Sequence, residues 1–223
     1  MARPATVSRP PVADADTDTI LDWFRENARL LIIGGVVVVA ALLGFWFYTQ
    51  SRLLRATNAE RTLMSAQQAM AQGNIPLAQT DLQTVTTRYR GTPATGQAAL
   101  LLAQIHYDQG QYEEGIRTLE SVAGTRGTAL MRPTFEALIA DGYLELSNAA
   151  EAARHYQNAA RETRFVADRD MYLAQAARAH VAAGDTAAAL SIWQGMADDP
   201  QSPVSAEARV RLGELMAAPV RGS

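Results

Sequence analysis

The sequence predicts an all-α protein in which one transmembrane helix precedes an α-solenoid of about four helix hairpins and a C-terminal capping helix. Two observations predict this fold. Residues Leu30–Tyr48 contain no charged side chain, and the chain beyond them repeats one pattern of small and large residues every 37 positions. The 223 residues then divide into a disordered tail (1–19), an amphipathic lead-in (20–29), the transmembrane helix (30–48) and the repeat domain (52–218).

The composition excludes several kinds of chemistry. The chain has no cysteine, so it forms no disulfides, and a zinc site would need histidine or carboxylate ligands. All 20 basic residues are arginine, which rules out a lysine nucleophile. Beyond residue 51 there are 16 arginines against 18 aspartates and glutamates. This net charge of about −2 gives no reason to expect nucleic-acid binding.

The residues before the apolar segment divide into two parts. Residues 1–19 carry three prolines and three aspartates among small and polar side chains. They cannot bury enough apolar surface to offset chain entropy, so we expect disorder. Residues 20–29 include Trp23 and Phe24 and predict a short amphipathic lead-in at the membrane interface. An alternative reading, in which these residues are only the frayed first turns of the anchor helix, stays open.

The segment Leu30–Tyr48 (LLIIGGVVVVAALLGFWFY) is long enough to cross a bilayer. As a helix it would measure ~28 Å, against a hydrocarbon thickness of ~30 Å. Its aromatic end, 45–48, suits the headgroup layer. A buried helix of a soluble domain would need a partner that is apolar all round, and a cleavable signal peptide has a shorter apolar run of ~7–15 residues. The sequence therefore predicts a single permanent anchor.

The charges that flank this segment do not set its orientation. Arg25 and Arg29 precede it, and Arg52, Arg55 and Arg61 follow it. The positive-inside rule is uninformative for such a balance, and large domains translocate largely regardless of local charge.

The chain beyond the anchor repeats with a period of 37 residues. Gly73, Gly110, Ser147 and Gly184 mark the same turn position in four consecutive repeats. Three further positions keep the same register. They are a first-helix alanine (Ala66, Ala103, Ala140, Ala177), a small second-helix residue (Ala78, Gly115, Ala152, Ala189) and a large one (Leu82, Leu119, Tyr156, Trp193). This pattern resembles the tetratricopeptide repeat (TPR).

The physical chemistry of the pattern favours paired antiparallel helices. Small residues at fixed offsets let two helices approach closely, and the large residue fills the neighbouring interface. Three residues beyond the usual repeat length predict longer connections between repeats, such as 90–97 and 126–132. An amphipathic stretch, 205–216, is expected to cover the exposed face of the last repeat.

The sequence offers no pattern that is typical of an enzyme. His106 and His180 occupy the repeat position at which Tyr143 also stands, so we interpret them as packing residues. His155 has no carboxylate at a diagnostic ligand spacing. Phosphate-binding loops and nucleophile elbows are absent. We therefore predict no catalytic residue, no cofactor and no metal.

The TPR resemblance implies a groove lined by the first helices of the repeats. The predicted groove residues are Leu63, Gln67, Met70, Leu100, Gln104, Tyr107, Asp141, Leu144, Met171, Arg178 and Val181. Flexible apolar side chains suit adaptable contacts with polypeptide. Only Arg178 could bind a C-terminal carboxylate, so that specialised mode is not expected. Alternatively, internal packing or an oligomer contact covers part of this lining.

The whole arrangement resembles the YfgM-type ancillary subunit of the bacterial SecYEG translocon. The segment FRENARLLIIGGVVVVAALLGFWFY (Phe24–Tyr48) looks like the entry helix and span of that family. The resemblance implies a single-pass inner-membrane protein with a cytoplasmic N-terminus and a periplasmic, chaperone-like TPR domain that binds emerging secretory proteins. Two other functions stay open: a structural accessory subunit of another membrane complex, such as an energy-transducing one, and a scaffold for envelope assembly.

Overall fold

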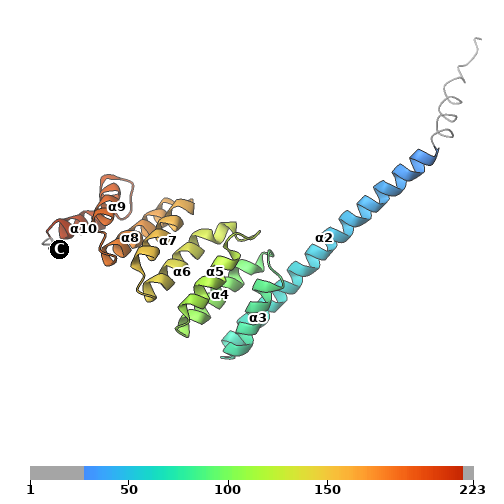
Figure 1. The fold of residues 1–223 in the computed structure, drawn as a ribbon, viewed down its shortest axis with the longest axis horizontal. Coiled ribbons are helices and arrows are strands. Elements are labelled where there is room, and N and C mark those ends of the chain that lie inside the picture. The colour runs from blue at the N-terminus through green and yellow to red at the C-terminus, as the bar shows by residue number, and fades with distance from the viewer. Residues whose placement is uncertain (1–27, 218–223) are drawn as a thin grey trace, which may run out of the picture. The chain divides into compact units, whose positions relative to one another are not determined.

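The structure is a computed structural model that describes residues 28–217, and over this range it is all-helical, as predicted (Figure 1). The predicted tail and all but the last two residues of the predicted lead-in lie outside the described residues. The elements are α2 (Ala28–Ala71), α3 (Ile75–Thr87), α4 (Ala94–Asp108), α5 (Tyr112–Ala123), the 3₁₀-helix η1 (Ala129–Met131), α6 (Arg132–Glu145), α7 (Ala149–Glu162), α8 (Val166–Ala182), α9 (Thr186–Asp198) and α10 (Ser205–Ala217). The chain forms two compact units, Met1–Leu53 and Leu54–Ser223.

The described part of the first unit, residues 28–53, is the N-terminal portion of α2. Its large apolar side chains are more than half exposed, from Ile33 to Tyr48. The Arg52 guanidinium lies 5.0 Å from the centroid of the Tyr48 ring. The side chains at 30–32, 35 and 38 lie outside the described part. Among the residues that are described, no helix combines the length and the apolar character that a membrane span requires. The predicted span therefore stays a prediction.

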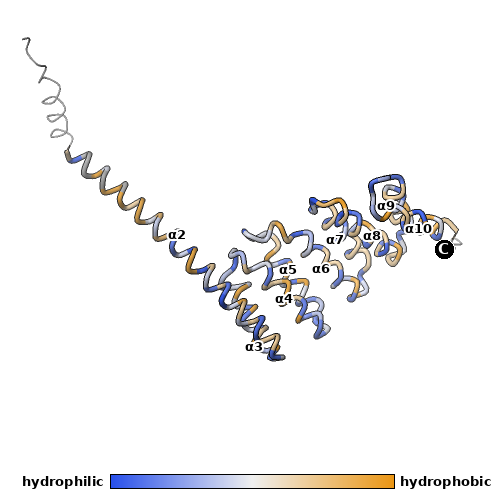
Figure 2. Tube along the Cα trace, turned by 180° about the vertical axis from the view of Figure 1, so that it is seen from behind, coloured by the Kyte–Doolittle hydropathy of each residue, from blue (hydrophilic) through white to orange (hydrophobic). Residues whose placement is uncertain are grey.

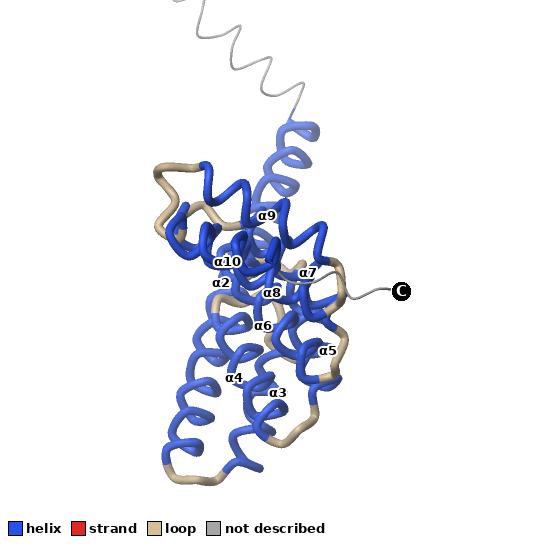
Figure 3. The backbone as a smooth tube through the Cα atoms, turned by 90° about the vertical axis from the view of Figure 1, so that its left-hand side faces the viewer, coloured by secondary structure: helices blue, strands red, loops and turns tan. Residues whose placement is uncertain are grey.

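The second unit is a row of four helix hairpins closed by one further helix. The hairpins are α2/α3, α4/α5, α6/α7 and α8/α9, and from α3 to α10 each helix packs against the next (Figures 1 and 3). The last part of α2 joins α3 through a buried cluster that includes Ala66 and Leu82. A hydrogen bond of 2.7 Å from the Ser65 hydroxyl to the Asp81 carboxylate also links these two helices.

The four hairpin turns share one backbone conformation. Gly73, Gly110 and Gly184 have φ of 75°, 72° and 81°, and Ser147 has a φ of 58°. The amide of the residue after each of them bonds to the carbonyl five residues earlier, as in the 2.8 Å bond from Asn74 to its α2 acceptor. This is the Schellman ending of a helix, which requires the left-handed residue. The predicted turn register is therefore confirmed.

The residue after the left-handed one opens the second helix. Asn74, Asn148 and Asp185 each accept a hydrogen bond from the backbone amide three residues later, at 3.0–3.3 Å. Such caps satisfy amide groups that have no partner within the helix. Gln111, in the second repeat, makes no side-chain cap. Each turn thus ends one helix and begins the next within three residues.

The core follows the predicted pattern of small and large residues. Leu82, Leu119, Tyr156 and Trp193 are all at most 4% exposed, and the four first-helix alanines are fully buried. Each buried cluster draws residues from one hairpin and from the helix that follows it, so the core continues from α2 to α10. Figure 2 shows apolar and polar residues alternating along these helices.

The connections between hairpins begin and end differently from the prediction. The connection predicted at 90–97 ends earlier, because α4 begins at Ala94 directly after Pro93. Proline suits the first turn of a helix, where its missing amide leaves no bond unmade. Pro133 is likewise the second residue of α6. Within the predicted connection at 126–132, η1 occupies 129–131.

Candidate functional site

Seven of the predicted groove residues are exposed on the first helices of the four hairpins. They are Gln67 on α2, Gln104 on α4, Asp141 and Leu144 on α6, and Met171, Arg178 and Val181 on α8. We call this set the first-helix face. Leu144, Met171 and Val181 are 39%, 49% and 41% exposed. The face therefore combines open apolar contacts with polar groups.

Leu63 does not belong to this face, contrary to the prediction. It is only 6% exposed and lies in the cluster that α2, α3 and α4 bury together. Leu100, one repeat later, is half-buried, and so is Met70. Ala174, three repeats on from Leu63, is also buried, at 3% exposed.

Tyr107 is a packing residue and not an open groove residue, which is a second correction. Its ring fills the space that a Cβ atom on Gly115 would occupy, and its hydroxyl end fills the corresponding space at Gly142. The hydroxyl donates a 3.0 Å hydrogen bond to the backbone carbonyl of Leu138. Burial, and then the nearby charge of Asp141, raises the pKa of Tyr107 well above its usual range. Tyr107 therefore joins the second repeat to the third.

The polar part of the first-helix face consists of two glutamines, one aspartate and one arginine, and α4 and α6 also carry the exposed carboxylates Asp108 and Glu145. Asp141 accepts a hydrogen bond from the Tyr156 hydroxyl. Loss of hydration raises the pKa of Asp141, the Tyr156 bond opposes this rise, and the charge of Glu145 adds to it. Gln104 donates a 2.8 Å hydrogen bond to the Asp108 carboxylate. A partner that brings backbone amides or basic side chains would match these acceptors.

Arg178 is held within the chain. Its guanidinium lies 2.5 Å from the Glu207 carboxylate on α10 and donates a 3.0 Å hydrogen bond to Gln175. It also lies 6.0 Å from the Trp193 ring. Arg178 and Val181 line a hollow of about 250 Å³ beneath α10. Because Arg178 fixes the capping helix, it does not serve as a free carboxylate-binding group.

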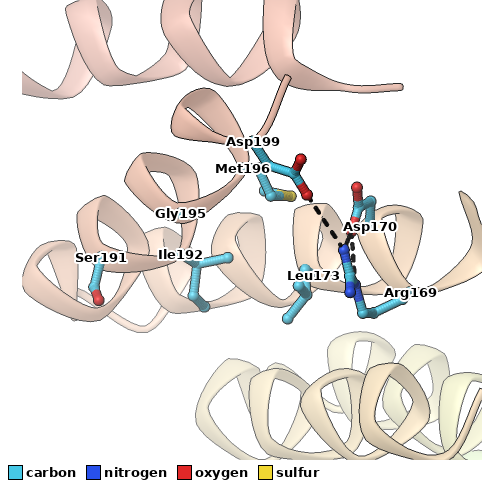
Figure 4. A pocket seen from close by; sticks show the side chains of 8 residues that line it. All are labelled: Arg169, Asp170, Leu173, Ser191, Ile192, Gly195, Met196 and Asp199. Carbon is cyan, nitrogen blue, oxygen red and sulfur yellow. Dashed lines mark hydrogen bonds and ion pairs between the residues drawn. The ribbon is translucent and has the colours of Figure 1, made fainter. Parts of the chain in front are cut away.

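A second hollow, of about 260 Å³, lies between α8 and α9 (Figure 4). Arg169 extends along it and donates a 2.9 Å hydrogen bond to Asp170, while Asp199 approaches the same guanidinium at 3.7 Å from the end of α9. Asp170 is 1% exposed, and its second oxygen is buried without a partner among the described residues. Arg169 therefore links Asp170 on α8 to Asp199 at the end of α9.

The histidines make contacts within the repeat array. His155 lies 2.7 Å from the Glu136 carboxylate and stacks on Tyr143. Although burial opposes ionisation, the hydrogen bonds from His155 and Asn158 hold the pKa of Glu136 below its usual range. His106 contacts Gln111 at 2.8 Å. No group of three or more potential metal ligands occurs in the described part of the chain.

Comparison with known protein families gives one finding. Two overlapping stretches, residues 22–140 and 59–174, match the model of the tetratricopeptide repeat-like domain. Together they cover more than half of the chain and include the first three hairpins. The first match begins before the apolar segment of α2. None of the curated proteins compared with the chain matches it.

Proposed function

Because the chain belongs to the tetratricopeptide repeat-like domain family, we propose that it is a membrane-anchored, non-enzymatic subunit that binds polypeptide through its first-helix face. Domains of this kind are protein-interaction modules. We further propose that it assists the bacterial Sec translocon, with the N-terminus cytoplasmic and the repeat array periplasmic. The Sec role is supported by the likeness of Phe24–Tyr48 to the span of YfgM-type subunits.

The proposed anchor is the uncharged stretch Leu30–Tyr48 of α2. Described side chains on every side of the helix are apolar and exposed, among them Val36, Leu43 and Phe47. A helix that is apolar all round is at its most stable in a nonpolar surrounding. Lipid supplies that surrounding, and the contact of Arg52 with the Tyr48 ring is suited to the headgroup layer.

The observation that carries the binding proposal is the exposure of Leu144, Met171 and Val181 on consecutive first helices. Such side chains supply adaptable contact area but few directional bonds. We expect extended segments of unfolded polypeptide to bind weakly and without a free C-terminus. Asp141 and Glu145 favour segments that also carry basic residues.

The test is a change of charge on the first-helix face. Leu144→Asp combined with Met171→Asp, in the full chain in detergent, should abolish binding of labelled unfolded peptides, measured by fluorescence anisotropy. The matched control is Leu77→Asp with Val210→Asp, since both residues are similarly exposed but lie on α3 and α10. Equal binding by both double variants would reject this face as the site.

A structural accessory subunit of another membrane complex is the second candidate. It is favoured by Arg178 and Tyr107, because internal contacts fix both side chains. A surface with fixed side chains suits one permanent partner better than many different ones. Crosslinking in native membranes separates the two functions. Many secretory proteins together with a translocon would support the first, whereas one stoichiometric partner would support the second.

A further inference from the structure

The two edges of the repeat array carry opposite charge. One edge is built by three connections between hairpins together with the helix ends that flank two of them, residues 88–93, 124–132 and 162–166, and we call it the loop edge. It contains five arginines and one glutamate. The other edge, the turn edge, consists of the hairpin turns and the helix starts after them, residues 72–76, 109–114, 146–151 and 183–188. It contains four acidic residues and no basic one.

The loop edge is continuous across three connections. A Cβ atom on Gly127 would lie 3.4 Å from the carbonyl oxygen of Thr92, so the first and second connections touch. Arg132 and Glu162 form an ion pair of 2.6 Å, which joins the second connection to the third. The arginines of this edge therefore belong to one surface.

Apolar side chains extend from the same surface. Leu130 and Phe165 are 81% and 69% exposed, and Val166 is 48% exposed. Arg126 and Arg164 are exposed and have no acidic partner among residues 28–217. Each of these two connections thus presents a bulky apolar residue close to an unpaired arginine. Exposed apolar side chains that gather on one surface among polar residues are typical of a site that contacts a protein or a membrane.

We propose that the loop edge rests on an anionic lipid surface. Arginine guanidinium groups are attracted to lipid phosphates, while Leu130 and Phe165 would insert among the headgroups and the first acyl carbons. A nucleic acid would match the charge of the edge but not its exposed aliphatic and aromatic tips. The contact ends at the fourth connection, where Asp198 and Asp199 reverse the charge.

The inference does not rest on the proposed anchor or on peptide binding. An anchor would hold the chain near the bilayer, whereas the loop edge would determine which side of the array faces the headgroups. Because the chain contains no cysteine, one introduced cysteine can report on each edge separately.

The experiment compares two labelled forms of the full chain. Ala129→Cys, on the loop edge, and Ala150→Cys, on the turn edge, each replace an exposed alanine and carry an environment-sensitive NBD group. Each form is reconstituted with vesicles of phosphatidylcholine, with and without phosphatidylglycerol. NBD at residue 129 should shift to the blue and be quenched by spin-labelled lipid when phosphatidylglycerol is present. NBD at residue 150 should not respond.

Two further variants identify the cause. Arg126→Gln with Arg164→Gln should remove the response of residue 129, and so should high salt, because screening weakens surface attraction. Leu130→Ser with Phe165→Ser should reduce quenching by lipid several-fold while the melting temperature stays unchanged. Equal responses at residues 129 and 150, or a response that does not depend on phosphatidylglycerol, would overturn the proposal.

Different results would reject the anchor proposal and the loop-edge proposal. If the labelled chain does not float with phosphatidylcholine vesicles, the anchor proposal is rejected. Flotation with phosphatidylglycerol vesicles that depends on Arg126 and Arg164 would still support the loop edge. A blue shift at residue 129 that needs an added protein and no lipid would reject the lipid proposal.

Discussion

Ser147 holds a left-handed backbone conformation that the other three repeats assign to glycine. Its φ of 58° places the Cβ atom close to the backbone, which costs about 1–2 kcal/mol for a residue with a side chain. The backbone hydrogen bonds of this turn match those of the other three, so they do not offset the cost. The third turn is therefore the strained one of the four.

Ser147→Gly should stabilise the protein by about 1 kcal/mol, since glycine adopts this conformation freely but loses more entropy on folding. Gly184→Ser, at the equivalent turn, should destabilise it by a similar amount. Thermal unfolding of the full chain in detergent measures both changes. A lower melting temperature for Ser147→Gly would contradict the assignment.

Two carboxylates should affect stability with opposite dependence on pH. The folded pKa of Asp141 is raised, so its contribution is present at acidic pH and lost as pH rises through that pKa. Asp141→Asn, which keeps an oxygen acceptor for Tyr156, should therefore raise the melting temperature at neutral pH. The gain should vanish below pH ~4, where an unperturbed aspartate is protonated.

Glu136 supplies the control of opposite sign. Its folded pKa is lowered, so its stabilising contribution is present at neutral pH and lost as pH falls through that pKa. Glu136→Gln should lower the melting temperature at neutral pH, and the difference should shrink in acid. If the two pH profiles ran in the same direction, one of the two assignments would be wrong.

At the level of elements, the packing of the second repeat against the third depends on two glycines that leave space for Tyr107. A Cβ atom on Gly115 would lie 2.2 Å from the Tyr107 ring, and Gly142 confines the same side chain at its other end. The Tyr107 ring cannot move away from one of these glycines without losing its contact with the other helix. Gly115 and Gly142, on different helices, thus leave the space in which Tyr107 packs, and this packing joins the second repeat to the third.

Gly115→Ala should destabilise the protein by ~1–3 kcal/mol through overpacking, although alanine favours a helix. Gly195→Ala is the matched control, because a Cβ atom there meets nothing within 4 Å and should stabilise α9 by ~1 kcal/mol. Melting temperatures should shift in opposite directions. Adding Tyr107→Ala should relieve most of the loss caused by Gly115→Ala, and additive losses would refute the contact.

The features that were predictable from sequence are those that one repeat determines locally. A left-handed turn at Gly73 and a fully buried large residue at Leu82 recur because backbone conformation and side-chain volume act within a single hairpin. The exposure of the groove positions depends instead on contacts between repeats. The repeat register predicts Leu63 and Tyr107 in the groove because it does not reveal how closely the neighbouring helix packs against them.

Contacts outside the repeat register were not predicted at all. Gly142 leaves space for the hydroxyl end of Tyr107, at a position where the other repeats carry no glycine. Asp170 is buried where other repeats have Ala59, Gly96 and Pro133. A buried carboxylate at a position of small residues was the available signal, since such a group requires a partner such as Arg169.

At the level of the whole molecule, the proposed orientation places the repeat array on the outer side of the inner membrane. Trypsin cleaves after arginine, and Arg126 and Arg164 are exposed in the connections between hairpins. Trypsin added to intact spheroplasts, at a salt concentration that screens any contact of these arginines with lipid, should therefore cut the array, while the same array in inverted vesicles should be protected. Cleavage only in inverted vesicles would reverse the orientation.

The three-residue hairpin turns limit how this architecture can change in length. All four have the same number of residues, whereas the connections between hairpins range from three to eight. One residue added to a turn would disrupt the backbone bonds that end one helix and begin the next. Insertions and deletions should therefore be tolerated only in the connections between hairpins. A foreign peptide grafted beside Gly127 should leave the buried face of every helix unchanged.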